Sequence, residues 1–293
     1  MGRTMEEQTK LEKRRVGLVE IAYLEDTPPH EDVSDEEALP IVLWLHGGYV
    51  THREWEPQRE HFGKKPWRSV YVDLPGHGGS SRCVDRYDVE LFARDMLEFL
   101  RGIEGASDPR TPVICVGHSL GGMIAQAMAK LEPGALSALI LADTTYSTQS
   151  TLRESVETRL ARLTFSLLSV ERLARMSAKE LGARRPDVGP MIYREMMAHA
   201  DDKRGFLKLL EAVFSFDSRP WLWRLRVPTL LLVAEENKGT MRQVRGFLKM
   251  VPHLEIEIIR QAGHMLNWDQ PEAFNQAVEQ YVDRIIEAQR QAS

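Results

Sequence analysis

The 293-residue sequence predicts an α/β protein with a mostly parallel, doubly wound sheet and an inserted helical cap. Two patterns lead to this fold class. Short apolar runs that end at glycine or proline alternate with longer segments of helical spacing, which is typical of βαβ units. Between residues 144 and 220 no such apolar run occurs, and only helical spacing is found. We therefore expect a polar tail at 1–14, an α/β core at 15–145 and 221–293, and a helical cap at 146–220.

Seven strands are expected in the core, and most of them are short and apolar throughout. A strand that is apolar on both sides is typical of a sheet covered by helices on both faces. Such sheets carry their ligands at the carboxyl ends of the strands. The predicted strands are residues 19–23, 41–45, 69–74, 112–116, 136–142, 229–233 and 254–259.

Helices are expected between these strands and after the last one. Within residues 84–103, Phe92, Met96 and Phe99 recur at helical spacing, so one face of that helix packs on the sheet. Further core helices are expected at 120–131 and 241–250, and a last one begins at Pro271.

Apolar residues of the predicted cap also recur at helical spacing. The methionines of this region leave two interpretations open: they pack between cap helices, or they give an apolar pocket an adaptable lining. The recurring residues are Leu152, Val156, Leu160 and Leu163; further helices are expected at 171–181, 190–200 and 202–214; the methionines are Met176, Met191, Met196 and Met197.

Composition and charge narrow the class of protein. The net charge is −5 and no basic segment is concentrated enough for a nucleic-acid surface. No apolar run approaches the length of a membrane span, and the charged N-terminus does not resemble a signal peptide. Two cysteines provide no disulfide framework. We therefore expect a cytoplasmic protein whose partner is a small molecule, with no nucleic acid and no membrane span; the sequence does not indicate an oligomeric state.

The segment VICVGHSLGGMIA, residues 113–125, brings a predicted strand directly into a helix through Ser119. A turn this tight strains the serine backbone, and the flanking Gly117 and Gly121 remove side chains that would clash. The hydroxyl then stands clear of the sheet, beside a helix N-terminus that can stabilise an oxyanion. A phosphate-binding loop would need a lysine after the second glycine, and none is present. We interpret Ser119 as a nucleophile.

Four motifs, taken in order, resemble the α/β-hydrolase superfamily, in particular its serine-nucleophile, esterase-like or lactonase-like members with a helical cap. The resemblance covers nearly all of the chain from about residue 16 onward and implies the α/β-hydrolase fold. The motifs are His46-Gly47-Gly48, Asp73-Leu74-Pro75-Gly76-His77-Gly78, Gly117-His118-Ser119-Leu120-Gly121 and Ala262-Gly263-His264.

The resemblance implies a role for several further residues. It makes His264, in QAGHMLNW, the general base for Ser119, and the backbone N–H groups of Gly48 and Leu120 the oxyanion hole. Side chains expected to line the substrate pocket are Tyr49, His118 and Met265, with His118 directed away from the nucleophile across the tight turn. No histidine spacing matches a metal site, so neither a metal nor a cofactor is expected.

The acid of the triad departs from the usual pattern. The family places an aspartate a few residues after the strand at 229–233, where this sequence has Glu235-Glu236-Asn237. An asparagine carries no charge and can favour the wrong histidine tautomer. Three alternatives stay open. The acid is Asp143, after the preceding strand, as in haloalkane dehalogenases and the protein phosphatase methylesterase; or it is Glu235 or Glu236; or Asn237 occupies its place in an impaired or specialised enzyme.

Together these residues predict a serine hydrolase with a catalytic triad and an oxyanion hole. It would cleave a carboxylic ester, thioester or lactone of a small to medium apolar substrate through an acyl-enzyme. Epoxide hydrolase and dehalogenase activities are disfavoured, because both resemblances need a carboxylate at position 119. Two alternatives are a ligand-binding pseudo-hydrolase, which Asn237 favours, and a non-hydrolytic lyase or cyclase on the same scaffold.

Overall fold

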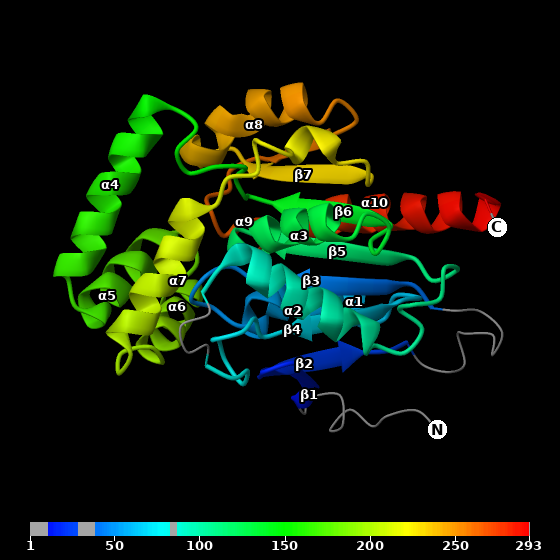
Figure 1. The fold of residues 1–293 in the computed structure, drawn as a ribbon, viewed down its shortest axis with the longest axis horizontal. Coiled ribbons are helices and arrows are strands. Elements are labelled where there is room, and N and C mark those ends of the chain that lie inside the picture. Colours follow the sequence, from blue (N-terminus) through cyan, green and yellow to red (C-terminus); the bar gives the residue numbers. More distant parts are fainter. Residues whose placement is uncertain (1–10, 29–38, 83–86, 293) are drawn as a thin grey trace.

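The computed structural model describes residues 11–28, 39–82 and 87–292, which form an eight-stranded sheet between two layers of helices (Figure 1). The strand order is β1-β2-β4-β3-β5-β6-β7-β8. Only β2 pairs antiparallel with its neighbours β1 and β4, and the remaining strands are parallel. The α/β-hydrolase fold expected from the sequence is therefore confirmed.

All seven predicted strands are present, and their ends differ from the predicted ends by at most three residues. The strands are β1 (Glu12–Val16), β2 (Val19–Asp26), β3 (Ile41–Leu45), β4 (Arg68–Val72), β5 (Val113–His118), β6 (Ala138–Ala142), β7 (Thr229–Ala234) and β8 (Glu255–Ile259).

The eighth strand, β1, corrects the predicted polar tail at 1–14, because residues 12–14 belong to it. It lies at the edge of the sheet, where Lys13 pairs with Glu20 of β2. Charged side chains on an edge strand prevent pairing with other chains. For the same reason this strand has no apolar pattern that sequence analysis could detect. The rest of the predicted tail, residues 1–10, lies outside the described residues.

Two apolar layers hold the helices against the sheet. On one face lie α2 (Val89–Arg101), α3 (Leu120–Leu131) and α8 (Lys238–Met250). The other face is covered by α1 (Glu56–Phe62), the short α9 (Leu266–Asp269) and the long α10 (Pro271–Ala292). The expected helices at 120–131 and from Pro271 are present, whereas α2 begins at Val89 and residues 84–86 of its expected range are not described. The sequence patterns did not predict α1 or α9.

Four helices follow β6 and precede β7, and they stand together at one end of the sheet (Figure 1). Their shared apolar core includes Met191, Ile192 and Phe206, and it also contacts Val50 and Trp268 of the remaining chain. This end of the sheet is the carboxyl end of the parallel strands, where the predicted catalytic residues lie. The helices are α4 (Leu152–Leu167), α5 (Val170–Leu181), α6 (Val188–Met197) and α7 (Lys203–Ser215).

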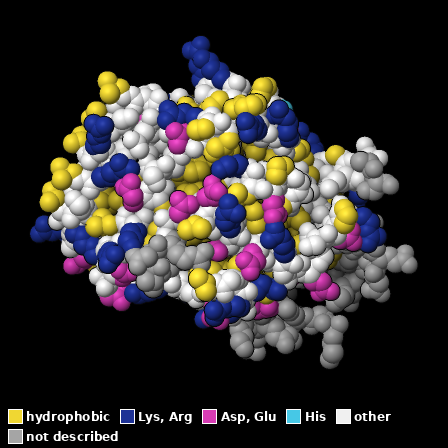
Figure 2. Space-filling view, in the orientation of Figure 1, with side chains coloured by type: hydrophobic (Ala, Val, Ile, Leu, Met, Phe, Trp, Pro, Cys, Tyr) yellow, Lys and Arg dark blue, Asp and Glu magenta, His cyan; other side chains and the backbone are white. Residues whose placement is uncertain are grey.

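The helix predicted from the leucine spacing is α4, but its apolar stripe faces outward. It begins with a capping box between Thr151 and Glu154, which satisfies free N–H groups of its first turn. Leu152 is 84 % exposed, and the other residues of the stripe are exposed as well. Hydrophobic side chains gather along the margin of the molecule where α4 lies (Figure 2). The four methionines of the cap differ in exposure: Met191 and Met196 are buried, Met197 is half-buried and Met176 is exposed.

The turn from β5 into α3 depends on close backbone contacts. Ser119 has a φ of 50°, in the left-handed region that residues with side chains seldom adopt. A Cβ atom on Gly117 would lie 2.4 Å from the carbonyl oxygen of Gly121, and one on Gly121 would lie 2.1 Å from that of Leu45. The two glycines thus allow α3 to approach β3 and β5 closely enough to hold Ser119 at the sheet edge.

Replacing Gly121 by alanine tests this contact. We expect the free energy of unfolding to fall by about 2 kcal/mol or more, because the new Cβ has to displace backbone atoms. Helix propensity alone predicts the opposite, a gain of about 1 kcal/mol. Urea unfolding followed by circular dichroism measures the change. The control is Ala129→Gly in the same helix, which should lose about 1 kcal/mol by propensity. A G121A variant as stable as the wild type would contradict the proposed packing.

Candidate active site

Three side chains from distant parts of the chain form a hydrogen-bonded series at the carboxyl end of the sheet. Ser119 follows β5, Asp143 follows β6, and His264 lies between β8 and α9. The Nε2 atom of His264 lies 3.2 Å from the Ser119 Oγ atom, and its Nδ1 atom lies 2.7 Å from Asp143 Oδ2. This is the arrangement in which an imidazole can take a proton from a hydroxyl while a carboxylate orients it.

Strained backbone at two of these residues is held by the neighbouring strands. Ser119 and Asp143 have φ angles of 50° and 40°. The Ser119 N–H donates to the Ala142 carbonyl at 3.0 Å, and the Asp143 N–H donates to that of Leu232 at 2.8 Å. The Thr144 hydroxyl donates to the Ser119 carbonyl at 2.7 Å. The surrounding structure therefore keeps both residues in conformations that each cost of order 1–3 kcal/mol.

The carboxylate of Asp143 is buried, with 1 % of the residue exposed, and it is fully hydrogen-bonded. Oδ1 accepts from the Thr240 hydroxyl at 2.6 Å and from the Ala234 N–H at 3.2 Å. Oδ2 accepts from His264 and from the Asn237 amide. Burial by itself raises the pKa of Asp143, but the hydrogen bond and charge of His264, with the other donors, lower the pKa below its ordinary value. The group is therefore a carboxylate at neutral pH.

Asn237 occupies the position where the resemblance leads one to expect an aspartate, and the structure gives it a different partner. Its Nδ2 atom donates to Asp143 Oδ2, and its Oδ1 atom accepts from the Gly239 N–H at 3.1 Å, which caps α8. Nδ2 also lies 3.2 Å from His264 Nδ1, but that nitrogen donates its proton to Asp143. A second carboxylate at 237 would be repelled by Asp143, whereas an amide supplies a donor.

The two glutamates considered as alternative acids bind elsewhere. Both side chains are exposed. Glu235 accepts from the backbone N–H of Gln261 at 2.9 Å, and Glu236 pairs with Arg184. Of the carboxylates proposed from the sequence, Asp143 is the one that lies beside His264.

The loop after β3 lies against the serine turn. A Cβ atom on Gly48 would lie 3.9 Å from the Leu120 side chain. The neighbouring N–H groups are occupied, since Gly47 donates to Glu54 at 2.6 Å and Tyr49 donates to His77 at 3.1 Å. In the described part of the chain, the N–H groups of Gly48 and Leu120 have no hydrogen-bond acceptor. These are the two donors expected from the sequence.

An apolar cavity of about 130 Å³ lies between Ser119 and the cap helices. Two histidines, His118 and His264, and one glutamate, Glu54, are among the residues that line it. Its walls come from both the sheet and the cap, and they include Met265 as expected. The apolar residues of the wall are Val50, Phe165, Leu181, Ile192, Met196, Leu210 and Met265.

Tyr49 and His118 also line the cavity, but their polar atoms are already bound. The Tyr49 ring stacks on Phe206 of α7 with centroids 4.2 Å apart, and its hydroxyl donates to the Phe206 carbonyl at 2.7 Å. His118 Nε2 lies 2.8 Å from the His264 carbonyl oxygen, and Nδ1 faces Glu54. These two residues therefore shape the cavity rather than offer hydrogen bonds to a substrate. Glu54, in the short helix η3 (His52–Trp55), was not singled out from the sequence, because an isolated glutamate carries no periodic signal.

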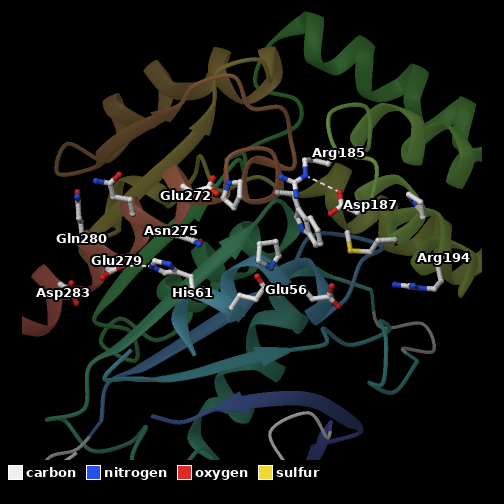
Figure 3. A pocket seen from close by; sticks show the side chains of 17 residues that line it. Glu56, His61, Arg185, Asp187, Arg194, Glu272, Asn275, Glu279, Gln280 and Asp283 are labelled. Carbon is white, nitrogen blue, oxygen red and sulfur yellow. Dashed lines mark hydrogen bonds and ion pairs between the residues drawn. The ribbon is translucent and has the colours of Figure 1, made fainter. Parts of the chain in front are cut away.

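A larger and more polar cleft lies apart from these residues. It measures about 1100 Å³ and is bounded by α1, α10, α6 and the segment that leads into α6 (Figure 3). Its labelled side chains are mostly charged, and the contacts drawn there join Arg185 to Asp187 and His61 to Glu279 (Figure 3). Neither Ser119 nor His264 lines it. We therefore choose the candidate site by the hydrogen-bonded series of Ser119, His264 and Asp143 and not by cavity size.

The described residues show neither a cluster that could bind a metal nor a helix that could span a membrane. Over residues 11–28, 39–82 and 87–292, no three histidine, cysteine, aspartate or glutamate side chains are grouped so that they could hold a metal ion. None of the described helices has both the length and the apolar character needed to cross a bilayer.

Comparisons with known proteins agree with the fold. The sequence profile of the "Alpha/beta hydrolase family" matches residues 42–277. The chain is 25 % identical over 272 residues to 3-oxoadipate enol-lactonase 2 of Acinetobacter baylyi, covering 90 % of this chain and 98 % of that protein. It is 26 % identical to an esterase of Mycobacterium tuberculosis, covering 84 % of each. Among solved structures, a thermophilic esterase from Thermogutta terrifontis shares the fold with a TM-score of 0.74 at 23 % identity, covering 94 % of this chain and 99 % of that one.

The buried carboxylate of Asp143 predicts a pH-dependent stability. Because its pKa is lowered in the folded state, its stabilising effect is complete above about pH 4, the range of a free aspartate, and is lost as the pH falls further. We expect Asp143→Asn to lower the free energy of unfolding by about 3 kcal/mol at pH 7, because it removes the charge that His264 and the other donors face. This difference should shrink below pH 4.

Thermal or urea unfolding at several pH values measures the effect. The matched control is Asp108→Asn, which removes a surface ion pair with Arg110 and should change stability little at any pH. If D143N were as stable as the wild type at pH 7, the carboxylate would not be held as described.

Proposed function

The chain belongs to the alpha/beta hydrolase family, and from this premise we propose that it is a serine hydrolase acting on a carboxylic ester, thioester or lactone. One observation carries the proposal. The hydroxyl of Ser119, the imidazole of His264 and the carboxylate of Asp143 form a continuous hydrogen-bonded series beside an apolar cavity. The names of the esterase and enol-lactonase relatives support the same class of reaction.

In the proposed reaction, His264 Nε2 takes the proton of Ser119 while Oγ attacks the carbonyl carbon of the substrate. The carbonyl oxygen becomes an oxyanion and is bound by the N–H groups of Gly48 and Leu120, which have no acceptor in the described structure. His264 then gives its proton to the leaving oxygen or sulfur as the acyl bond breaks. A water molecule, deprotonated by His264, hydrolyses the acyl-enzyme and regenerates Ser119.

Asp143 would act through His264 rather than on the substrate. Its Oδ2 atom accepts the Nδ1 proton, so Nε2 keeps its lone pair directed at Ser119. When His264 becomes charged, the carboxylate stabilises the imidazolium. Asn237 supports this role by donating to the same carboxylate, so we interpret it as part of a working site and not as a sign of lost activity.

The cavity favours a small, uncharged acyl group. Its wall is mainly apolar, and it carries no lysine or arginine that could pair with a substrate carboxylate. The volume of about 130 Å³ suits an acyl chain of a few carbons. The enol-lactonase relative is named for the enol-lactone of 3-oxoadipate, which keeps one free carboxylate. We therefore propose a substrate that differs from that one in charge.

Covalent labelling of Ser119 tests the proposed activity. A fluorophosphonate probe should label the wild-type protein at Ser119, and Ser119→Ala should abolish labelling. Asp143→Asn should slow labelling by about 10⁴-fold, because the base loses its orienting charge. Glu235→Gln is the matched control and should react at the wild-type rate. If the folded wild-type protein is never labelled, the proposal is wrong, and the alternative of a ligand-binding pseudo-hydrolase is favoured.

The acyl preference can be tested with p-nitrophenyl esters of increasing chain length. We expect acetate and butyrate esters to be cleaved with a higher kcat/KM than octanoate, and a succinate half-ester to be cleaved poorly. Phe165→Ala should enlarge the cavity and move the preference toward longer chains by about tenfold, since each added methylene gains 1–3 kcal/mol when it is accommodated. The control is Met176→Ala, on an exposed cap position. Equal kcat/KM values for all of these esters, or a preference for the succinate half-ester, would contradict the proposed preference for a small, uncharged acyl group.

A further inference from the structure

A buried ion pair lies directly behind the proposed catalytic residues. Glu54 is fully buried and His118 is 1 % exposed. Glu54 Oε1 lies 2.5 Å from His118 Nδ1, and among the described residues neither atom has another polar partner. Burying two charges costs free energy that their pairing only partly offsets. A role in the site would explain why the protein has such a pair.

The hydrogen bonds indicate the charge state of the pair. His118 Nε2 faces a carbonyl oxygen, which can only accept, so this nitrogen carries a proton. Nδ1 faces a carboxylate and carries a proton as well. Burial lowers the pKa of His118, but the adjacent carboxylate of Glu54 outweighs it and raises the pKa overall. Burial likewise raises the pKa of Glu54, and His118 more than reverses this effect. The pair is an imidazolium and a carboxylate at neutral pH.

Each partner holds a different segment of the site. Glu54 Oε2 accepts the Gly47 N–H at 2.6 Å, which fixes the loop that carries the free N–H of Gly48. His118 Nε2–H donates to the backbone carbonyl of His264 at 2.8 Å, which fixes the loop that carries the proposed base. His118 itself immediately precedes Ser119. One ion pair thus contacts all three segments that have to meet in the proposed reaction.

The backbone of Glu54 adds a second connection to the same loop. Its carbonyl accepts from the Asn267 amide at 2.9 Å and from the Trp268 indole at 2.7 Å. Both residues belong to α9, which begins two residues after His264. The short helix η3 (His52–Trp55), which carries Glu54, is therefore attached to α9 through its backbone. Through the Glu54 side chain and His118 it is also attached to residues 260–265, the base loop, which carries His264.

The pair also keeps the site electrically balanced. The His118 ring centroid lies 4.8 Å from that of His264, so an unpaired positive charge there would oppose protonation of the base. Conversely, an unpaired Glu54 carboxylate beside Gly47 would repel a developing oxyanion. With both charges present, each cancels the effect of the other on the reacting atoms.

We propose that Glu54 and His118 are positioning residues of the hydrolase. Through one buried ion pair they hold two loops in place beside Ser119: residues 46–51, the oxyanion loop, and residues 260–265, the base loop. The inference rests on the proposed function. It requires that Glu54 and His118 act as a unit and that their loss affects the chemical step more than substrate binding.

The test uses Glu54→Gln, His118→Gln and the double variant in the full-length protein. Each single variant should lower kcat for p-nitrophenyl acetate by about tenfold or more, with KM within about twofold of the wild type. The double variant should lose no more than the worse single variant, because the two residues act together. The control is Asp26→Asn, which breaks a partly buried ion pair with Arg59 and should change stability without changing kcat.

A second readout does not depend on turnover. The proton on His264 Nδ1 should give a downfield NMR signal in the wild type and in D26N, and this signal should broaden or disappear in E54Q. If wild-type Ser119 is never labelled, the proposed function fails, and the NMR signal alone then decides the positioning role. Should E54Q not fold, the double variant replaces it, since it removes both buried charges. Wild-type kcat or an unchanged signal in the folded variants would overturn the inference, as would additive losses.

Discussion

The proposed site depends on one buried carboxylate. Asp143 sits in a strained conformation after β6 and accepts hydrogen bonds from β7, from α8 and from the loop that follows β8. Because four donors converge on two oxygens, the carboxylate joins segments that are far apart in the sequence. The imidazole of His264 is oriented by this contact, and only then does its other nitrogen face Ser119. Parallel strand order alone brings these segments near each other but does not set the ring orientation.

Much of the fold could be predicted because its signals are local. A buried strand such as β5 is apolar throughout, and the glycines around Ser119 mark a turn that few other residues can adopt. The strand β1 could not be predicted, since its charged side chains face solvent at a sheet edge. The outward apolar face of α4 is a similar case, because periodicity gives the helix but not the direction in which its stripe points.

The site was only partly predictable for a different reason. Ser119, His264, Gly48 and Leu120 follow recognisable motifs, whereas the choice between Asp143 and the residues at 235–237 depends on which strand end reaches His264. That is a distance in three dimensions, and no local pattern encodes it. Glu54 was missed because its partner, His118, is 64 positions away in the chain and the two meet only in the folded protein.

Each of the two carboxylates near the proposed reacting atoms has a histidine partner, and this arrangement bears on the proposed substrate. Asp143 faces His264, and Glu54 faces His118, so each carboxylate has one histidine as its main partner. A substrate carboxylate entering the cavity would find no unpaired cation among the residues that line it, and it would lose its hydration against apolar side chains. A neutral acyl group meets no such cost. In the proposed reaction, the contacts that orient His264 toward Ser119 would therefore also disfavour charged substrates, because they leave no cation free in the cavity wall.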